Sequence, residues 1–316
     1  MKNRYLVVIL VVLSIISLFI GVTQLSLKDL LLGQDLKTQI LLLSRIPRLV
    51  TVVIAGMSMA ISGLILQQIS RNRFVAPTTA ATVDSAKLGV LVSLILWPAA
   101  SSLGKMLVAF AFALAGTFLF MGILKRIKLK NTVFIPLLGI MLGNIIDAVT
   151  TFIAYRFDLV QNVSSWLMGN VAMISKGRYE LLYLSIPLVV VAYLYANKFT
   201  IAGMGEEFAN NLGMNYQQVV TIGVSIVALL SALVIITVGR IPFLGLVVPN
   251  IVSIYQGDHL RNSIGTTALF GAIFLLVCDI VGRVLIAPYE IPIGLTVGVV
   301  GSLIFLWLLV RRRRHG

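Results

Sequence analysis

Four ionisable side chains fall inside apolar runs of this sequence that are long enough to cross a membrane: Asp84, Lys87, Asp147 and Asp279. Charged groups are costly in such a setting, so they mark ion pairs or water-filled pathways. Asp279 precedes Arg283 by four residues, which puts both on one helix face and predicts an internal ion pair. Asp84 and Asp147, together with Asn144, are therefore the candidates for lining an aqueous pathway.

The patterns of catalytic and metal sites are missing from the sequence. The histidines are His259 and His315, and neither belongs to an H-E-x-x-H pair. No G-x-x-x-x-G-K-[ST] pattern occurs, so we expect no nucleotide bound through a P-loop. The single cysteine, Cys278, lies in an apolar run and is expected to be a packing residue. We expect a chain that is not an enzyme and has no catalytic residue, metal or cofactor.

One polar segment, 203–213, interrupts the apolar sequence and has the design of a short helix with an exposed surface. Acidic residues in its first turn match the positive end of the helix dipole, and a glycine suits its end. An apolar stripe on this helix predicts contact with a partner, although a loop helix lying on the protein's own surface would have the same pattern. The expected contact residues are Gly205, Glu206, Glu207, Phe208, Ala209, Asn210, Leu212 and Gly213.

The elements that hold these residues are membrane helices. Of the 316 residues, 59% are hydrophobic and 11% charged, against about 25% charged in soluble domains. Continuous apolar runs indicate a helical bundle and not a closed β-barrel. We expect an all-α polytopic protein, one domain over 1–316, with about ten spans at 5–25, 46–69, 86–100, 103–124, 132–154, 181–197, 217–238, 241–257, 264–287 and 291–310.

Lysine and arginine set the expected orientation. The formal net charge is +14, and dense basic clusters at 125–130 and 311–314 follow apolar runs. Such clusters favour the cytoplasmic side and anionic lipid, so nucleic-acid binding is not expected. With ten spans both termini are cytoplasmic, and so is the loop of about 198–217. We expect a multi-pass protein of the cell membrane whose channel wall comes from 132–154 and 46–69.

Several motifs, in order along the chain, resemble the iron-siderophore and cobalamin ABC importer permease family (FecCD-type). Ser-Arg-Ile-Pro-Arg-Leu resembles the start of one of its spans, and Ser-Trp-Leu-Met-Gly resembles its Trp-containing outer segment. Two further matches resemble its final spans. These motifs occupy residues 44–49, 165–169, 239–250, 257–261, 278–283 and 288–294, and the loop at 205–213 is similar too. At 72–89, and with Pro-Asn at 249–250, the chain is most similar to the petrobactin and anguibactin-type subgroup.

The resemblance implies a type II importer fold and a set of partners. These are a second permease subunit, two cytoplasmic ATPases that bind the 205–213 loop, and an extracellular binding lipoprotein. For the permease pair, a heterodimer is favoured and a homodimer is possible. Arg45, Arg48 and Arg283 match positions that dock acidic residues of that lipoprotein, although anchoring to lipid headgroups would also suit them. The implied cargo is a ferric siderophore of the catechol type, such as petrobactin.

Three alternatives remain open at the level of sequence. An ion-coupled secondary transporter would use the membrane acids. An ABC permease for haem or cobalamin would share the family motifs. A structural membrane subunit explains neither the 203–213 segment nor the outer arginines. The sequence does not identify the siderophore, and span boundaries near 70–90 and 155–180 are uncertain.

Overall fold

Every regular element is a helix in a computed structural model that describes residues 3–21, 35–79, 81–126, 134–172, 174, 179–257 and 259–313. Within these residues, short 3-10 or π turns accompany the α-helices. The elements are α1 (Asn3–Phe19), α3 (Asp35–Ile40), η1 (Leu41–Arg45), α4 (Ile46–Ser70), η2 (Pro77–Thr79), α5 (Thr82–Leu96), α6 (Ser102–Arg126), α7 (Phe134–Arg156), α8 (Val160–Leu167), η3 (Glu180–Leu184), α9 (Ser185–Leu194), α10 (Ala196–Ala202), α11 (Glu206–Asn211), α12 (Tyr216–Val238), α13 (Leu244–Gln256), α14 (Leu260–Val284) and α15 (Ile293–Arg313).

Each of the ten predicted apolar segments contains a helix, but fewer helices meet the length and hydropathy of a full span. Among the described residues five do so, and a sixth does if the pair Glu180–Leu194 and Ala196–Ala202, bent by 59°, counts as one span. Three apolar helices are shorter, namely Asn3–Phe19, Leu244–Gln256 and Ile293–Leu308. A helix needs about 20 residues to cross the hydrocarbon core, so the count of ten spans stays a prediction.

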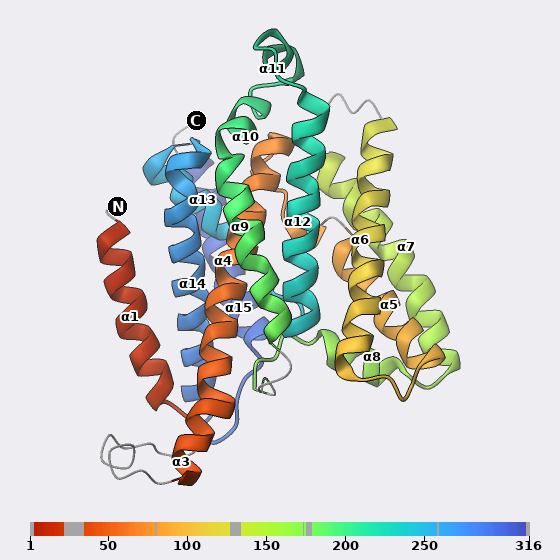
Figure 1. Cartoon of the computed structure of the whole chain (residues 1–316), viewed down its shortest axis with the longest axis vertical. Helices are drawn as coiled ribbons and strands as arrows, with labels where there is room; N and C mark the ends of the chain where they lie inside the picture. Colours follow the sequence, from red (N-terminus) through yellow and green to blue (C-terminus); the bar gives the residue numbers. More distant parts are fainter. Residues whose placement is uncertain are drawn as a thin grey trace.

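Helix α4 lies in the middle of the bundle, against α12, α13 and α14 (Figure 1). Its neighbours approach through glycine: a Cβ on Gly63 would lie 1.9 Å from the carbonyl oxygen of Gly245, and one on Gly56 would lie 2.6 Å from that of Gly271. Backbones can pack this closely only without side chains. Because 72% of its apolar window is buried inside the chain, α4 leaves little surface for the channel wall expected of 46–69.

A buried glutamine compensates for the proline inside α13. Pro249 has no N–H, so the carbonyl of Gly245, one turn earlier, loses its usual helical partner. The side-chain amide of Gln67, on α4, donates to that oxygen at 3.2 Å and to Leu246 O at 3.3 Å. A neighbouring side chain thus satisfies the backbone beside the proline, as a kinked helix in a membrane requires.

Helices α5, α6, α7 and α8 form a second group on the right of Figure 1. The apolar windows of α6 and α7 are only 33% and 22% buried inside the chain. On α7 the exposed fractions reach 63% at Ile145, 72% at Phe152 and 80% at Tyr155. This helix therefore presents a broad face to lipid, to a cavity or to another subunit.

The two ends of the bundle differ in what they present. The start of α1, the end of α15 and α11 lie at one end, here called the α11 end, which is uppermost in Figure 1. Helices α3 and α8 lie at the opposite end, the α8 end. The predicted placement of both termini on the side of the 203–213 segment agrees with this arrangement. The side of the membrane that each end faces stays a prediction, and residues 127–130 and 314 lie outside the described part.

Candidate functional site

The three predicted pathway residues lie together in one cleft. Asp84 comes from α5, and Asn144 and Asp147 come from α7, on the open side of the second helix group. The cleft has a volume of about 450 Å³. Its lining residues are Thr78, Val83, Asp84, Lys87, Gly139, Ile140, Asn144, Asp147, Ser164, Leu167, Met168 and Arg240. Sequence reasoning missed Lys87 and Arg240 as members, although Lys87 stands one helical turn after Asp84.

Polar contacts join α5 to α7 along this cleft. The Lys87 ammonium donates to Asp147 Oδ1 at 2.7 Å and to Thr151 Oγ1 at 3.1 Å. Asp84 lies against α7 one turn away, where a Cβ on Gly143 would be 2.3 Å from Asp84 Oδ2. The side chain of Asp147 is 42% exposed and that of Lys87 is 19% exposed, so this ion pair borders open space.

Backbone pairing fixes Arg240 at the edge of the cleft. The Arg240 N–H donates to Leu167 O at 3.0 Å, and the Asn170 N–H donates to Val238 O at 3.0 Å. Between these bonds Gly239 adopts φ +97, and a Cβ there would lie 2.9 Å from backbone atoms of Gly169. Two glycines facing each other therefore let the segments 167–170 and 238–240 lie in direct contact. The Arg240 side chain is exposed.

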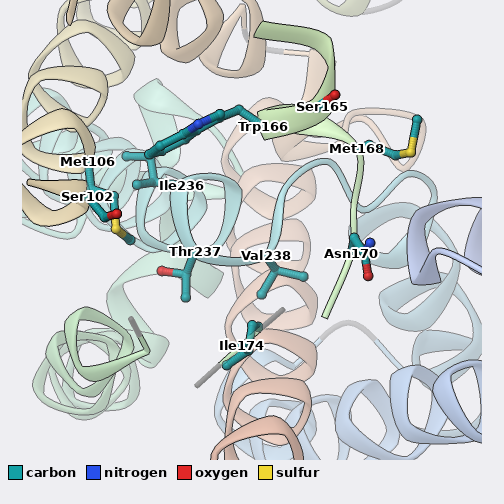
Figure 2. A pocket seen from close by; sticks show the side chains of 10 residues that line it. All are labelled: Ser102, Met106, Ser165, Trp166, Met168, Asn170, Ile174, Ile236, Thr237 and Val238. Carbon is teal, nitrogen blue, oxygen red and sulfur yellow. The ribbon is translucent and has the colours of Figure 1, made fainter. Parts of the chain in front are cut away.

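A second cavity of about 260 Å³ lies on the other side of the same segment, and Met168 borders both. Figure 2 shows the Trp166 ring extending from α8 toward Ile236 and Met106. These last two belong to the buried cluster on which the Trp166 ring packs. The Trp-containing segment thus forms a partition between two hollows at the α8 end.

The three arginines predicted for docking lie at the α8 end, and two of them, Arg48 and Arg283, belong to an internal ion-pair cluster. Arg48 donates to Asp279 Oδ1 from Nη2 at 2.8 Å and to Glu290 Oε2 from Nη1 at 2.7 Å. Arg283 Nη2 lies 2.7 Å from Asp279 Oδ2. That Oδ2 accepts no hydrogen bond within the described residues, so this contact is an ion pair without hydrogen-bond geometry. The predicted internal pair of Asp279 and Arg283 is confirmed.

The same cluster also holds the end of α1. Arg283 donates through Nη1 to the carbonyls of Ser17 and Ile20, both at 2.9 Å, and Arg45 donates to Leu18 O. Cations suit the negative end of a helix dipole. With side chains of Arg48 and Arg283 only 13% and 5% exposed, these guanidinium groups are occupied inside the chain, and their docking role stays a prediction.

The polar segment forms the short helix that the sequence predicts, with exposed apolar residues. Gly205 and Gly213 have φ +127 and +74, conformations that favour glycine. Ala209 is fully buried, while Phe208 and Leu212 are 48% and 59% exposed. The acidic pair of the first turn and Asn210 are exposed as well. The predicted apolar stripe is therefore only partly exposed: Ala209 packs inside the chain, and Phe208 and Leu212 face outward.

The α11 segment is attached to the central helix. A Cβ on Gly203 would lie 2.4 Å from Nε2 of Gln68, and one on Gly205 would lie 2.4 Å from Nη2 of Arg71. Gln68 is in the last turn of α4, and Arg71 directly follows that helix. A displacement of α11 would therefore press on the end of α4.

The fold and these sites define a polytopic helical membrane protein in which one short helix, α11, exposes apolar side chains. The FecCD transport family matches residues 9–311, and the chain belongs to this family. It is 61% identical over 315 residues to the petrobactin import system permease protein YclN of Bacillus subtilis, covering 100% of both chains. It is 39% identical to the ferric-anguibactin transport system permease protein FatD of Vibrio anguillarum, covering 93% of this chain and 94% of FatD.

A solved structure shares the fold. The chain superposes with a TM-score of 0.87 on a structure described as an inward-facing conformation of a metal-chelate type ABC transporter, at 22% identity, covering 98% of each chain. At this identity the likeness establishes the fold alone. Family membership and the apolar helices together make the chain a multi-pass membrane protein.

Proposed function

We propose that this chain is the permease subunit of an ABC importer for a ferric siderophore, of the catechol-bearing kind that includes petrobactin. The observation that supports this most strongly is the 61% identity, over the full length of both chains, to a petrobactin import permease. Relatives named for anguibactin and petrobactin follow at 39% and 37% identity. A named vitamin B12 permease is 29% identical. The sequence identity is higher to the siderophore permeases than to the vitamin B12 permease, which favours a siderophore over cobalamin as the cargo.

The proposed assembly contains a second permease subunit, two cytoplasmic ATPases and an extracellular binding lipoprotein. The broad exposed face of α7 and the cleft beside it give the second permease a place to pack. A heterodimer is favoured over a homodimer by the resemblance stated above. On this arrangement the α11 end is cytoplasmic, both termini included, and the cleft of Asp84, Asn144 and Asp147 opens toward the shared channel.

The α11 helix is the proposed contact with an ATPase. Exposed Phe208 and Leu212 offer an apolar surface, and exposed Glu206 and Glu207 surround it with negative charge. An amphipathic helix of this kind fits a groove on a partner. Its contacts with Gln68 and Arg71 connect that partner to α4, so a rigid-body movement of the ATPase would reach the core of the bundle.

The lipoprotein would dock at the α8 end. Arg45, Arg48 and Arg283 remain the proposed cations for that contact, but the ion-pair cluster sets a condition. Glu290, 24% exposed, is the most accessible carboxylate on Arg48. A lipoprotein carboxylate would therefore have to replace Glu290 before it could bind the Arg48 guanidinium.

Replacing Leu212 with Asp tests the proposed function. A buried charge in the apolar contact should abolish co-purification of the ATPase and uptake of the ⁵⁵Fe-siderophore, while the permease stays in the membrane at its normal level. Tyr289→Asp is the matched control for ATPase co-purification, because Tyr289 is also exposed (76%) but lies at the α8 end, away from α11. ATPase binding that survives Leu212→Asp would contradict the coupling role, and a wild-type complex without ferric-siderophore uptake would contradict the function.

A further inference from the structure

We propose that the cleft between α5 and α7 is an anion-binding site for the cargo, in which Lys87 and Arg240 bind the negatively charged oxygens of a ferric chelate. This inference rests on the proposed function and adds the chemistry of the pathway to it. The cleft holds two cations, Lys87 and Arg240, and two carboxylates, Asp84 and Asp147. Its formal charge is therefore zero before a ligand enters.

Arg240 is the cation that is open to a ligand. Its backbone is fixed by the hydrogen bond to Leu167 O, and its side chain is exposed at the edge of the cleft. Among the residues that the structure describes, no carboxylate forms a salt bridge with its guanidinium. A guanidinium presents a planar set of donors suited to paired anionic oxygens, such as those of catecholate or carboxylate groups.

Lys87 is the second cation of the cleft, and it already has a carboxylate partner. Its ammonium is paired with Asp147 at 2.7 Å, and that carboxylate is 42% exposed to the cleft. The contact with Thr151 at 3.1 Å keeps the ammonium on α7 as well. An anionic oxygen that enters the cleft could replace Asp147 as the partner of Lys87 without leaving either cation unpaired. Asp84, which lies against Gly143, would remain in place.

The opposing charges also explain how such a site could release its cargo. A conduit needs contacts weak enough for the ligand to leave. Asp147 competes with the ligand for Lys87, so it lowers the affinity of the cleft for any anion. Neutralising Lys87 should therefore lower the affinity for the anion, whereas neutralising Asp147 should raise it. A purely structural ion pair would give the same effect for both.

The experiment measures equilibrium binding of an anionic ⁵⁵Fe tris-catecholate chelate to the full chain in its importer complex, reconstituted in nanodiscs. Arg240→Gln and Lys87→Gln should each weaken binding about tenfold, the loss expected for one charged hydrogen bond. Asp147→Asn should strengthen binding, because it releases Lys87. Arg240→Lys should retain part of the affinity. Lys105→Gln is the matched control, since Lys105 lies at the start of α6 and bonds to Pro98 O.

Several outcomes would overturn the proposal. Unchanged binding in Arg240→Gln and Lys87→Gln would exclude the anion site. Weaker binding in Asp147→Asn would mean that the ion pair of Lys87 and Asp147 only stabilises the structure. A double variant, Lys87→Met with Asp147→Leu, removes the pair without leaving an unpaired charge, and its binding should fall like that of Lys87→Gln. If the wild-type complex takes up no ferric siderophore in vesicles, the proposed function fails as well. If the wild-type complex takes up ferric siderophore but Arg240→Gln and Lys87→Gln bind the chelate as the wild type does, only the anion site is contradicted.

Discussion

At the scale of single residues, Asp279 is the charge on which the α8 end depends. Its side chain is 2% exposed, and the carboxylate contacts both Arg48 and Arg283. Removing one partner of a buried ion pair leaves the other charges uncompensated, which typically costs about 3–5 kcal/mol. Because Arg283 also holds the end of α1, the effect should extend beyond the cluster itself.

We predict that Asp279→Asn lowers the apparent unfolding temperature of the purified chain markedly. Glu290→Gln, at a side chain that is 24% exposed, should lower it much less. The neighbouring Cys278 is the single cysteine of the chain and is 2% exposed, so a thiol-reactive dye reports its exposure as the protein unfolds. Equal unfolding temperatures for Asp279→Asn and the wild type would show that the cluster is not a stabilising element.

The sequence could predict the kinds of residues in this cluster but not their partners. Arg48 and Asp279 are 231 residues apart, and Arg48 and Glu290 are 242 apart, so no local spacing connects them. The pair of Asp279 and Arg283 was predictable because four residues separate them on one helix. Arg240 was missed in the cleft for the same reason, whereas Lys87, one helical turn after Asp84, could have been included from its spacing.

At the scale of elements, glycine contacts decide how closely the helices approach α4. Gly63→Ala should separate α4 from α13, because the new Cβ would lie 1.9 Å from Gly245 O and the obstacle is backbone. We expect a large loss of thermal stability and reduced amounts of protein in the membrane. Gly122→Ala on α6 is the matched control, since nothing lies within 4 Å of a Cβ there.

The control variant should be neutral or slightly stabilising, because alanine favours helix over glycine by about 1 kcal/mol. Both variants are measured by the same thiol-dye unfolding curve and by quantitative immunoblotting of membranes. Normal stability of Gly63→Ala would mean that the two helices can separate at little cost. It would also weaken the proposed path from α11 through α4 to the bundle.

The positions of the helices followed from the sequence better than their boundaries. The apolar run predicted at 86–100 is a helix that begins at Thr82 and ends at Leu96, and the run predicted at 264–287 begins at Leu260. Polar residues such as Asp84 lowered the local hydropathy and concealed the start of α5. In the structure this aspartate, on α5, packs against Gly143 of α7, a contact that no hydropathy profile contains.

At the scale of the whole molecule, the orientation in the membrane is open to direct measurement. We predict that Glu207→Cys, on α11, reacts with a membrane-impermeant thiol reagent only after the cells are permeabilised. Ser101→Cys, at an exposed position between α5 and α6, should react in intact cells. The buried Cys278 contributes little background. The reverse pattern of labelling would invert the topology and place α11 out of reach of any cytoplasmic ATPase.

The arginine contacts at the end of α1 have a consequence for the order in which the protein is made. Ser17 and Arg283 are 266 residues apart, and α1 packs mainly on α14. At about 5–20 residues per second, a ribosome needs roughly 13–53 s to synthesise the chain between them. Until then, the carbonyls of Ser17 and Ile20 and the α14-facing surface of α1 lack these partners, although Arg45, which bonds Leu18 O, has already been made. We therefore expect lipid or an insertase to cover the α14-facing surface of α1 while the rest of the protein is translated.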